Sequence, residues 1–310
     1  MIEIITQFAI FIAIFLYGMT VMRIGLYNLS HRKLKQFLVS MTNTPLKGMI
    51  IGTVITAILQ SSSAVMVITI GFIAAGLLTF KQSIGIILGT NIGTTVTTEF
   101  ITIDLIYHAI IPFLVIGALL LFTRKLLSFN VGAILFGLGC LFVAMNGFEN
   151  LAKPLSTIPV IHSSIELSNQ YNLIGVGLGT LLTAVIQSSS ATTGIIMGFM
   201  SENLVTLSSG IAIVLGANIG TCVTAFIASI GANLESKLAA YAHIWLNILG
   251  VILFYPFIKF LGAAAATVTS LPDVQLAHVS VIFNVLSSFI ALPLAGFLAQ
   301  FIIRVHGKQA

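Results

Sequence analysis

The chain has 310 residues, of which 58% are hydrophobic and only 7% are charged. A mean hydropathy of +1.12 excludes a water-soluble globular domain and predicts an all-α polytopic membrane protein. The 13 Lys and Arg outnumber the 8 Asp and Glu. These basic residues stand at the ends of apolar segments and form no patch with interleaved aromatic residues, so we expect the lipid bilayer and not nucleic acid as the partner.

The N-terminal stretch is apolar to about Met22 and has neither a basic start nor a small-residue cleavage site, which predicts a retained first helix. Residues 30–41 mix basic and apolar side chains, a pattern that fits a short interfacial helix and a solvated basic loop equally well. No loop is long enough for a soluble domain. The apolar stretches fall near 5–22, 46–79, 82–98, 104–123, 126–147, 173–204, 207–230, 237–258 and 276–303.

Two of these stretches, 46–79 and 173–204, are too long for one membrane crossing of about 20 residues and too short for two. Each has the same polar pentapeptide, Gln-Ser-Ser-Ser-Ala, near its middle, beginning at Gln60 and at Gln187. Polar groups are costly in a membrane, so we expect this run to bind a ligand. The pattern predicts two half-helices that meet at the pentapeptide, as a re-entrant hairpin or as a broken helix.

The two pentapeptides lie 127 positions apart (187 − 60), and this offset holds without a gap from 52–97 to 179–224. Roughly half of the aligned positions are identical, which indicates an internal duplication. We therefore predict a first transmembrane repeat over 1–125 and a second over 126–310, which together form a single transport domain.

Three crossings separate the two hairpins if the other seven stretches each span the membrane, and an odd number makes the repeats inverted. The distribution of charge agrees with this count. One side has a single acid, Glu235, against Arg23, Arg32, Lys33, Lys35, Lys47, Lys81, Arg124, Lys125, Lys237, Arg304 and Lys308. The other side has Lys153 and Lys259 against Glu3, Glu99, Asp104, Glu149, Glu166, Glu202 and Asp273. The basic side faces the cytoplasm in bacteria, which predicts an outer N-terminus and an inner C-terminus.

A second polar cluster, Gly-x-Asn-Ile-Gly-Thr, follows each pentapeptide by 31 residues (91 − 60 and 218 − 187). Glycines beside an asparagine let the backbone leave helical geometry, and freed carbonyls with Thr hydroxyls are oxygen ligands that suit Na⁺. Serines at half-helix N-termini suit an oxyanion. No Lys or Arg lies within either motif pair, so helix termini, hydroxyl and amide donors and co-bound Na⁺ have to balance the anion's charge.

Other interpretations of these residues are open. Small polar residues also pack transmembrane helices together, and for any single Ser or Thr this alternative is equally good. An intramembrane serine hydrolase is disfavoured, because no Gly-x-Ser-x-Gly surrounds a candidate nucleophile, and we expect no enzyme. A Na⁺-selective channel does not fit inverted broken-helix repeats. Cys140 and Cys222 lie in apolar sequence without metal-ligand spacing, so we expect no transition-metal site and no cofactor besides the coupling ion.

The paired Gln-Ser-Ser-Ser and Gly-x-Asn-Ile-Gly-Thr motifs, in this order over nearly the whole chain, resemble those of the type II sodium-phosphate cotransporters and their bacterial relatives. The resemblance implies Na⁺-driven import of inorganic phosphate across the cytoplasmic membrane by alternating access. It implies a substrate site at Gln60, Ser61, Ser62, Ser63, Gln187, Ser188, Ser189 and Ser190. For sodium it implies Gln60, Ser63, Asn91, Thr94, Thr95, Gln187, Ser190, Asn218 and Thr221.

The chain departs from the family pattern in part. The family's His-x-x-Phe/Leu-Asn element is present at His243 and Asn247, but in the first repeat His108 is followed by Pro112, and His278 stands at a longer spacing from its asparagine. We expect these histidines to pack between helices. Many bacterial relatives continue into a cytoplasmic regulatory domain, so regulation of this kind would here need a separate partner. Homo-oligomerisation, another oxyanion such as arsenate or sulfate, the opposite net direction, and rocking or elevator movement are left open.

Overall fold

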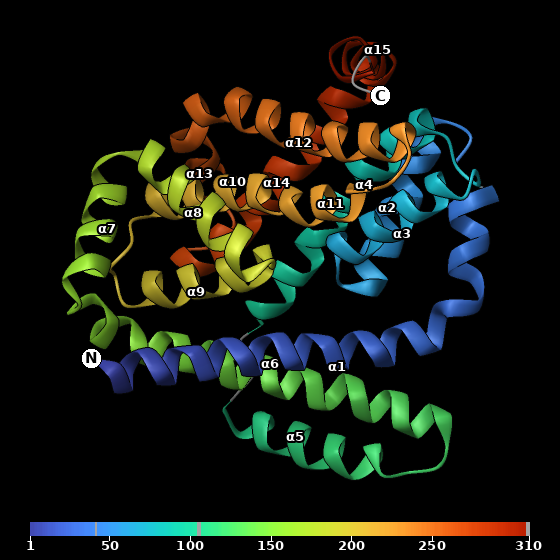
Figure 1. Cartoon of the computed structure of the whole chain (residues 1–310). Coiled ribbons are helices and arrows are strands. Elements are labelled where there is room, and N and C mark those ends of the chain that lie inside the picture. The colour runs from blue at the N-terminus through green and yellow to red at the C-terminus, as the bar shows by residue number, and fades with distance from the viewer. Residues whose placement is uncertain (41, 104–106, 308–310) are drawn as a thin grey trace.

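The computed structural model describes residues 1–40, 42–103 and 107–307, with side chains except at 31–40 and 107–109. This part of the chain is helical and contains no strand, which confirms the predicted all-α class (Figure 1). The first half has α1 (Ile2–Ser40), α2 (Pro45–Leu59), α3 (Ser62–Ala74), α4 (Phe80–Ile101) and α5 (Tyr107–Leu121). The second half has α6 (Leu126–Ser156), α7 (Pro159–Gln170), α8 (Asn172–Ile186), α9 (Ser189–Ser201), α10 (Leu207–Gly220), α11 (Cys222–Ser229), α12 (Leu234–Phe254), α13 (Ile258–Ala266), α14 (Pro272–Ala291) and α15 (Ala295–His306).

Six helical segments of the described residues are long and apolar enough to cross a membrane. They are Ile2–Ser30, Phe80–Ile101, Leu126–Ser156, Leu207–Ser229, Leu234–Ala266 and Pro272–His306. These match six of the seven crossings predicted from the sequence. The seventh, 104–123, corresponds to α5, whose helix has 15 residues and whose approach at 104–106 lies outside the described residues.

Three features differ from the sequence prediction. Residues 30–40 are helical, as in one of the two alternatives for 30–41, but they continue α1 and do not form a separate short helix; Met41 and the side chains of 31–40 lie outside the described part. α7 is a separate helix that begins at Pro159 and was not predicted. The stretch 276–303 is broken by a 3₁₀ turn around Pro293, and Figure 1 shows α15 end-on where α14 runs across the picture. Proline removes a helix hydrogen bond, which explains the break.

The duplication is visible in where the helices begin. α2, α3 and α4 begin at Pro45, Ser62 and Phe80, and α8, α9 and α10 begin 127 residues later in each case (172 − 45, 189 − 62, 207 − 80). The capping residues repeat as well, because Thr79 and Thr206 both cap the following helix with their side chains. Equivalent sequences therefore adopt the same local structure, whereas the inverted orientation of the repeats stays a prediction.

The helices form two groups (Figure 1). α1, α5 and α6 pack together as one layer beside a bundle that holds both pentapeptides. α9 has the main contact with α6, and α2 has the main contact with α1. We call these groups the α1–α5–α6 layer and the bundle.

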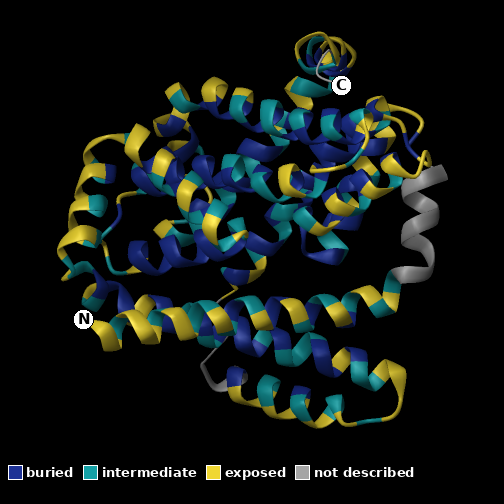
Figure 2. Cartoon of the chain, in the orientation of Figure 1, coloured by how far each residue is buried: buried dark blue, intermediate teal, exposed yellow. Residues whose placement is uncertain are grey.

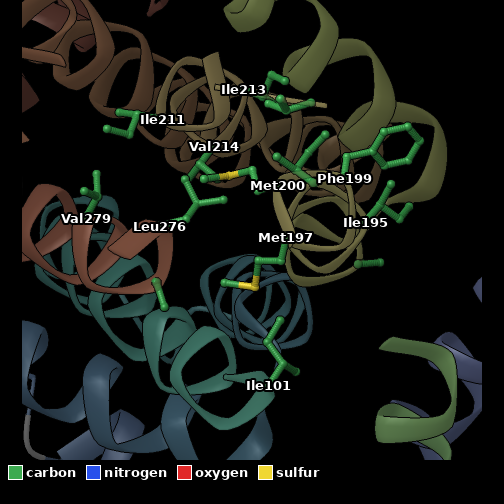
Figure 3. Packing of buried hydrophobic residues seen from close by; sticks show 14 of the residues in the cluster. Ile101, Ile195, Met197, Phe199, Met200, Ile211, Ile213, Val214, Leu276 and Val279 are labelled. Carbon is green, nitrogen blue, oxygen red and sulfur yellow. The ribbon is translucent and has the colours of Figure 1, made fainter. Parts of the chain in front are cut away.

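Two cores of buried apolar side chains stabilise this arrangement. One core joins α1 and α6 to α8–α10 and α12–α14, and the other joins α2–α4 to α11, α12 and α15. Figure 3 shows Met200, Val214 and Leu276, from α9, α10 and α14, pointing toward one another in the first core. Each core contains residues from both halves of the chain, so the halves are interlocked.

The outer surface is apolar, as a membrane protein requires. Exposed residues run along the outer faces of many helices (Figure 2), and they include large side chains such as Leu119 on α5, Val185 on α8 and Phe260 on α13. A contiguous apolar surface of this extent would be unstable in water. We conclude that the protein is a multi-span membrane protein.

Candidate functional site

The two pentapeptides form the same tight turn between two helices. Gln60 ends α2 with a φ of 51°, and Gln187 ends α8 with a φ of 58°. The left-handed conformation is unfavourable by roughly 1–2 kcal/mol for residues with a Cβ, and such strain is typical of functional sites. Glycine would form this turn without cost, so a glutamine in both copies suggests that its side chain is used.

The serine after each glutamine starts the next helix. The Ser61 hydroxyl accepts a hydrogen bond from the N–H of Ala64 at 3.1 Å, and the Ser188 hydroxyl accepts one from the N–H of Ala191 at 3.2 Å. α3 and α9 therefore both begin at a pentapeptide. Their first backbone N–H groups lack helical partners and carry the positive end of the helix dipole, an arrangement that binds anions.

A cavity of about 530 Å³ brings the two halves of the chain together. It is lined by Ser63 from the first pentapeptide, Gln187 from the second and Thr224 from α11. The hydroxyl oxygens of Ser63 and Thr224 are 3.1 Å apart, within hydrogen-bond distance. Its other lining residues are apolar: Ala64, Val67, Ile68, Ile227 and Ala228. Within this mainly apolar cavity, hydroxyl and amide groups of both repeats line the same space.

The two turns differ in their surroundings. Gln60 is 2% exposed, and its side-chain Oε1 has no hydrogen-bond partner among the described residues. Its backbone carbonyl oxygen accepts a hydrogen bond from Nε of Arg23 at 3.0 Å. Gln187 is exposed toward the cavity. No Lys or Arg lies within either motif pair, but the packing of α1 beside α2 brings Arg23, which lies outside both motifs, to the first turn.

The second polar clusters remain helical, contrary to the prediction that their glycines free the backbone. α4 runs through Asn91 without a break. Thr221 is the single residue between the end of α10 and the start of α11, and its backbone torsion angles are close to helical values. The hydroxyls bond to carbonyls of their own helix. These bonds are Thr94 to Thr90 at 2.8 Å, Thr95 to Ile92 at 2.7 Å and Thr221 to Asn218 at 2.7 Å.

The glycines in these clusters serve helix packing. A Cβ at Gly89 would lie 2.1 Å from the carbonyl oxygen of Met49, and one at Gly216 would lie 2.0 Å from that of Val176. Glycine is therefore needed so that α4 can lie against α2 and α10 against α8. Such close contact holds each pentapeptide hairpin at a fixed position on its neighbouring helix.

The two cluster asparagines have different partners. The Asn91 side-chain Nδ2 donates to Oδ1 of Asn247 on α12 at 3.0 Å, and Nδ2 of Asn247 donates to the backbone oxygen of His243. Asn218 instead donates to the carbonyl of Val214 on its own helix. Asn91 therefore belongs to a polar network that connects the first repeat to α12.

The histidines pack between helices in two different ways. His243 is buried, and neither ring nitrogen has a hydrogen-bond partner among the described residues. His278 pairs through Nδ1 with Glu99 of α4 at 2.9 Å. The side chain of His108 lies outside the described part. Packing was expected for all three, and the pairing of His278 with Glu99 had no signal in the sequence.

Not all predicted site residues line the shared cavity. Of the pentapeptide residues, Ser63, Ala64 and Gln187 do so, whereas Ser62 and Ser190 are buried at the starts of α3 and α9. Thr224 lines the cavity and Arg23 reaches the first turn, and neither was among the predicted site residues. Thr224 closes the second cluster and could have been included by its place in the motif, whereas Arg23 was counted only as a charge at the end of the first apolar stretch.

Comparisons with known proteins place most of the chain in one family. Residues 14–150 and 159–271 match the family described as Na⁺/Pi-cotransporter. The Bacillus subtilis (strain 168) uncharacterized protein YqeW is 41% identical over 292 residues, which cover 94% of each chain. The Escherichia coli (strain K12) putative inorganic phosphate export protein YjbB is 23% identical over 296 residues, which cover 94% of this chain but 53% of that protein.

A more distant similarity is confined to part of the chain. The human sodium-dependent phosphate transport protein 2B is 30% identical over 146 residues, which cover 43% of this chain and 21% of the human protein. No solved structure matches.

Proposed function

The chain belongs to the Na⁺/Pi-cotransporter family, and from this premise we propose that it is a sodium-coupled symporter that imports inorganic phosphate. The observation that carries the proposal is the cavity where Ser63 of the first pentapeptide faces Gln187 of the second. A phosphate ion there would lie near hydroxyl and amide donors of both repeats. The protein would lie in the cytoplasmic membrane, with the N-terminus outside and the C-terminus inside.

Coupling would follow from electrostatics. Two helix N-termini and several hydroxyl donors favour an anion, while hydroxyl, amide and carbonyl oxygens favour Na⁺. A cation and an anion bound close together stabilise each other, and this mutual effect is the coupling free energy of a symporter. Two Na⁺ with divalent phosphate would be electroneutral. A third Na⁺ would make transport respond to voltage, by about 2.3 kcal/mol per 100 mV.

Alternating access would arise from movement between the two helix groups. The α1–α5–α6 layer meets the bundle mainly through α6 with α9 and α1 with α2. Gly194 and Gly198 of α9 lie close against Met145 and Phe148 of α6, because glycine leaves room for α6 there. We propose that the bundle slides or rocks against the layer along this contact.

A second direction of transport has its own support. YjbB, whose similarity covers 94% of this chain and 53% of YjbB, is described as a putative inorganic phosphate export protein. Import and export by one scaffold differ in the gradient that drives them. A symporter that uses an inward Na⁺ gradient imports phosphate, so concentrative uptake driven by that gradient decides for import.

The test is uptake of radiolabelled phosphate into proteoliposomes that contain the purified chain. We expect concentrative uptake with an inward Na⁺ gradient, its loss when K⁺ or choline replaces Na⁺, and its loss in Gln60→Ala or Gln187→Ala. A K⁺ diffusion potential set with valinomycin then reports whether net charge moves. Competition by unlabelled arsenate and sulfate measures selectivity.

Two results would count against the proposal. Absence of Na⁺-dependent uptake by folded, inserted protein would contradict it. Phosphate efflux that does not depend on Na⁺ would favour export.

A further inference from the structure

Arg23 is the only basic residue within the apolar segment Ile2–Ser30 of α1. Arginine inside a membrane helix is costly and generally marks a functional site. Its Nε donates to the backbone carbonyl oxygen of Gln60 at 3.0 Å, so this charge is held at the first pentapeptide. The function proposed above did not use it.

The charge of Arg23 has no acidic partner in the described part of the chain. The three ion pairs there are Lys153–Glu202, His162–Glu166 and His278–Glu99. Among the described residues, the Arg23 guanidinium forms one hydrogen bond, which Nε donates to Gln60. Both Nη groups are therefore free to donate to a ligand. A half-buried cation without an acid is destabilising unless an anion compensates it.

A second group beside Arg23 also lacks a partner. Oε1 of Gln60 is buried, and no described residue donates a hydrogen bond to it. An unsatisfied buried amide oxygen costs about 1–3 kcal/mol. The guanidinium and this amide therefore leave a donor and an acceptor unused at the turn before α3, and neither residue lines the cavity of Ser63 and Gln187. A protonated phosphate bound at this turn, which accepts through its oxygens and donates through P–OH, would satisfy both.

Among the described residues, no Lys or Arg forms a hydrogen bond with the second pentapeptide, whereas Arg23 bonds to the first. In the part of the chain that the structure describes, the fixed positive charge therefore belongs to the first pentapeptide.

We propose that Arg23 is the charge-bearing and positioning residue of the first pentapeptide, where Nε holds the turn and the Nη groups contact phosphate. This inference rests on the proposed function. It predicts effects of opposite sign, because a fixed cation attracts phosphate but repels Na⁺. Removal of the charge therefore weakens phosphate binding and strengthens Na⁺ binding measured without phosphate. A merely structural role would weaken both.

The experiment uses the full chain in detergent and follows the shift of its thermal unfolding midpoint with Na⁺ alone and with phosphate in the presence of Na⁺. We compare Arg23→Gln, Arg23→Lys and the exposed control Arg124→Gln. For Arg23→Gln we expect the apparent Kd for phosphate to rise about tenfold or more, while Na⁺ alone binds more tightly. Arg23→Lys keeps the charge and loses the planar fork, so its phosphate affinity falls less and its Na⁺ affinity is unchanged. Arg124→Gln behaves as the unmodified protein.

The outcomes separate this inference from the proposed function. If the unmodified protein responds to phosphate and Na⁺ but Arg23→Gln weakens both alike, or changes neither, the role of Arg23 is overturned and the symporter stands. If the unmodified protein responds to neither ligand, both are overturned. Should Arg23→Gln fail to fold, the test moves to Arg23→Lys. Weaker phosphate binding at unchanged Na⁺ affinity then supports the inference, and equal weakening of both overturns it.

Discussion

The hydroxyl oxygens of Ser63 and Thr224 lie 3.1 Å apart, which joins α3 to α11 across 161 residues of sequence. Ser63 belongs to the pentapeptide of the first half, and Thr224 belongs to the Gly-x-Asn-Ile-Gly-Thr cluster of the second half. The two kinds of motif, from different halves of the chain, therefore meet at this contact. The cavity beside them is also lined by Gln187. This contact gives the most direct way to ask whether the motifs act as one site.

Replacement of Ser63 by Ala and of Thr224 by Val should be non-additive. Each single change removes one hydroxyl of the pair and should raise the KM for phosphate or Na⁺ about three- to tenfold. The double variant should be no worse than the more severe single variant, because residues in contact share one interaction free energy. Uptake kinetics in proteoliposomes measure this. Ser288→Ala, which removes a buried hydroxyl bonded to the Leu88 carbonyl, should lower stability without a change in KM. Strictly additive effects would contradict a shared site.

Gln187→Gly should stabilise the protein and impair transport. Gln187 has a φ of 58°, which glycine adopts without strain, and no described side chain hydrogen-bonds to its amide. We expect the free energy of unfolding to rise by about 0.5–1 kcal/mol while Na⁺-dependent uptake falls at least tenfold. Asn203→Gly is the matched control, since Asn203 also has a φ of 58° but stands outside the pentapeptides. It should gain similar stability and keep its uptake. Unchanged uptake by Gln187→Gly would remove Gln187 from the site.

Gly89→Ala and Gly216→Ala should each destabilise the protein, because the added methyl group would meet a backbone carbonyl oxygen at 2.1 and 2.0 Å. Overpacking of this kind costs about 1–3 kcal/mol, which should lower the unfolding midpoint in detergent. Gly177→Ala is the control within α8, where nothing lies within 4 Å of the new Cβ. Higher helix propensity should leave its stability unchanged or raised by up to about 1 kcal/mol. Equal midpoints for all three variants would show that the helices can separate without cost.

Asn247→Leu tests whether the polar network at Asn91 serves Na⁺. The change removes the acceptor that holds the Asn91 amide at 3.0 Å, so a ligand oxygen of Asn91 would lose its orientation. We expect the KM for Na⁺ to rise about three- to tenfold, with a smaller change in the KM for phosphate. Asn284→Leu, which removes an amide bonded only within α14, serves as the control. A pure loss of stability at unchanged Na⁺ dependence would assign the Asn91–Asn247 bond to packing.

Cysteine labelling in intact cells should report the orientation. Cys140 and Cys222 are both buried, so background reaction with a membrane-impermeant maleimide should be low. A cysteine at the exposed position Ser163, on α7 near Glu166, should react from outside. A cysteine in place of Lys237, on the basic side, should react only after the membrane is permeabilised. The reverse pattern would place the N-terminus in the cytoplasm.

The sequence by itself determined the class, the duplication and the turns. Long continuous apolar stretches indicate an all-helical membrane protein, because a bilayer admits only helices and closed barrels and barrel strands alternate apolar with polar residues. The repeated pentapeptide also located both turns, since polar residues capable of capping helices interrupt an apolar run. The 127-residue offset between the two pentapeptides recurs in the helix starts Ser62 and Ser189.

Only the tertiary structure decided which residues meet. The contact of Ser63 with Thr224 and the approach of Arg23 to Gln60 depend on how helices distant in sequence pack. Helix periodicity specifies an apolar face but not the neighbour that covers it. The glycines of the second clusters illustrate the same limit. From sequence alone, Gly89 fitted a broken helix, and only the position of α2 showed that it permits close contact within an intact one.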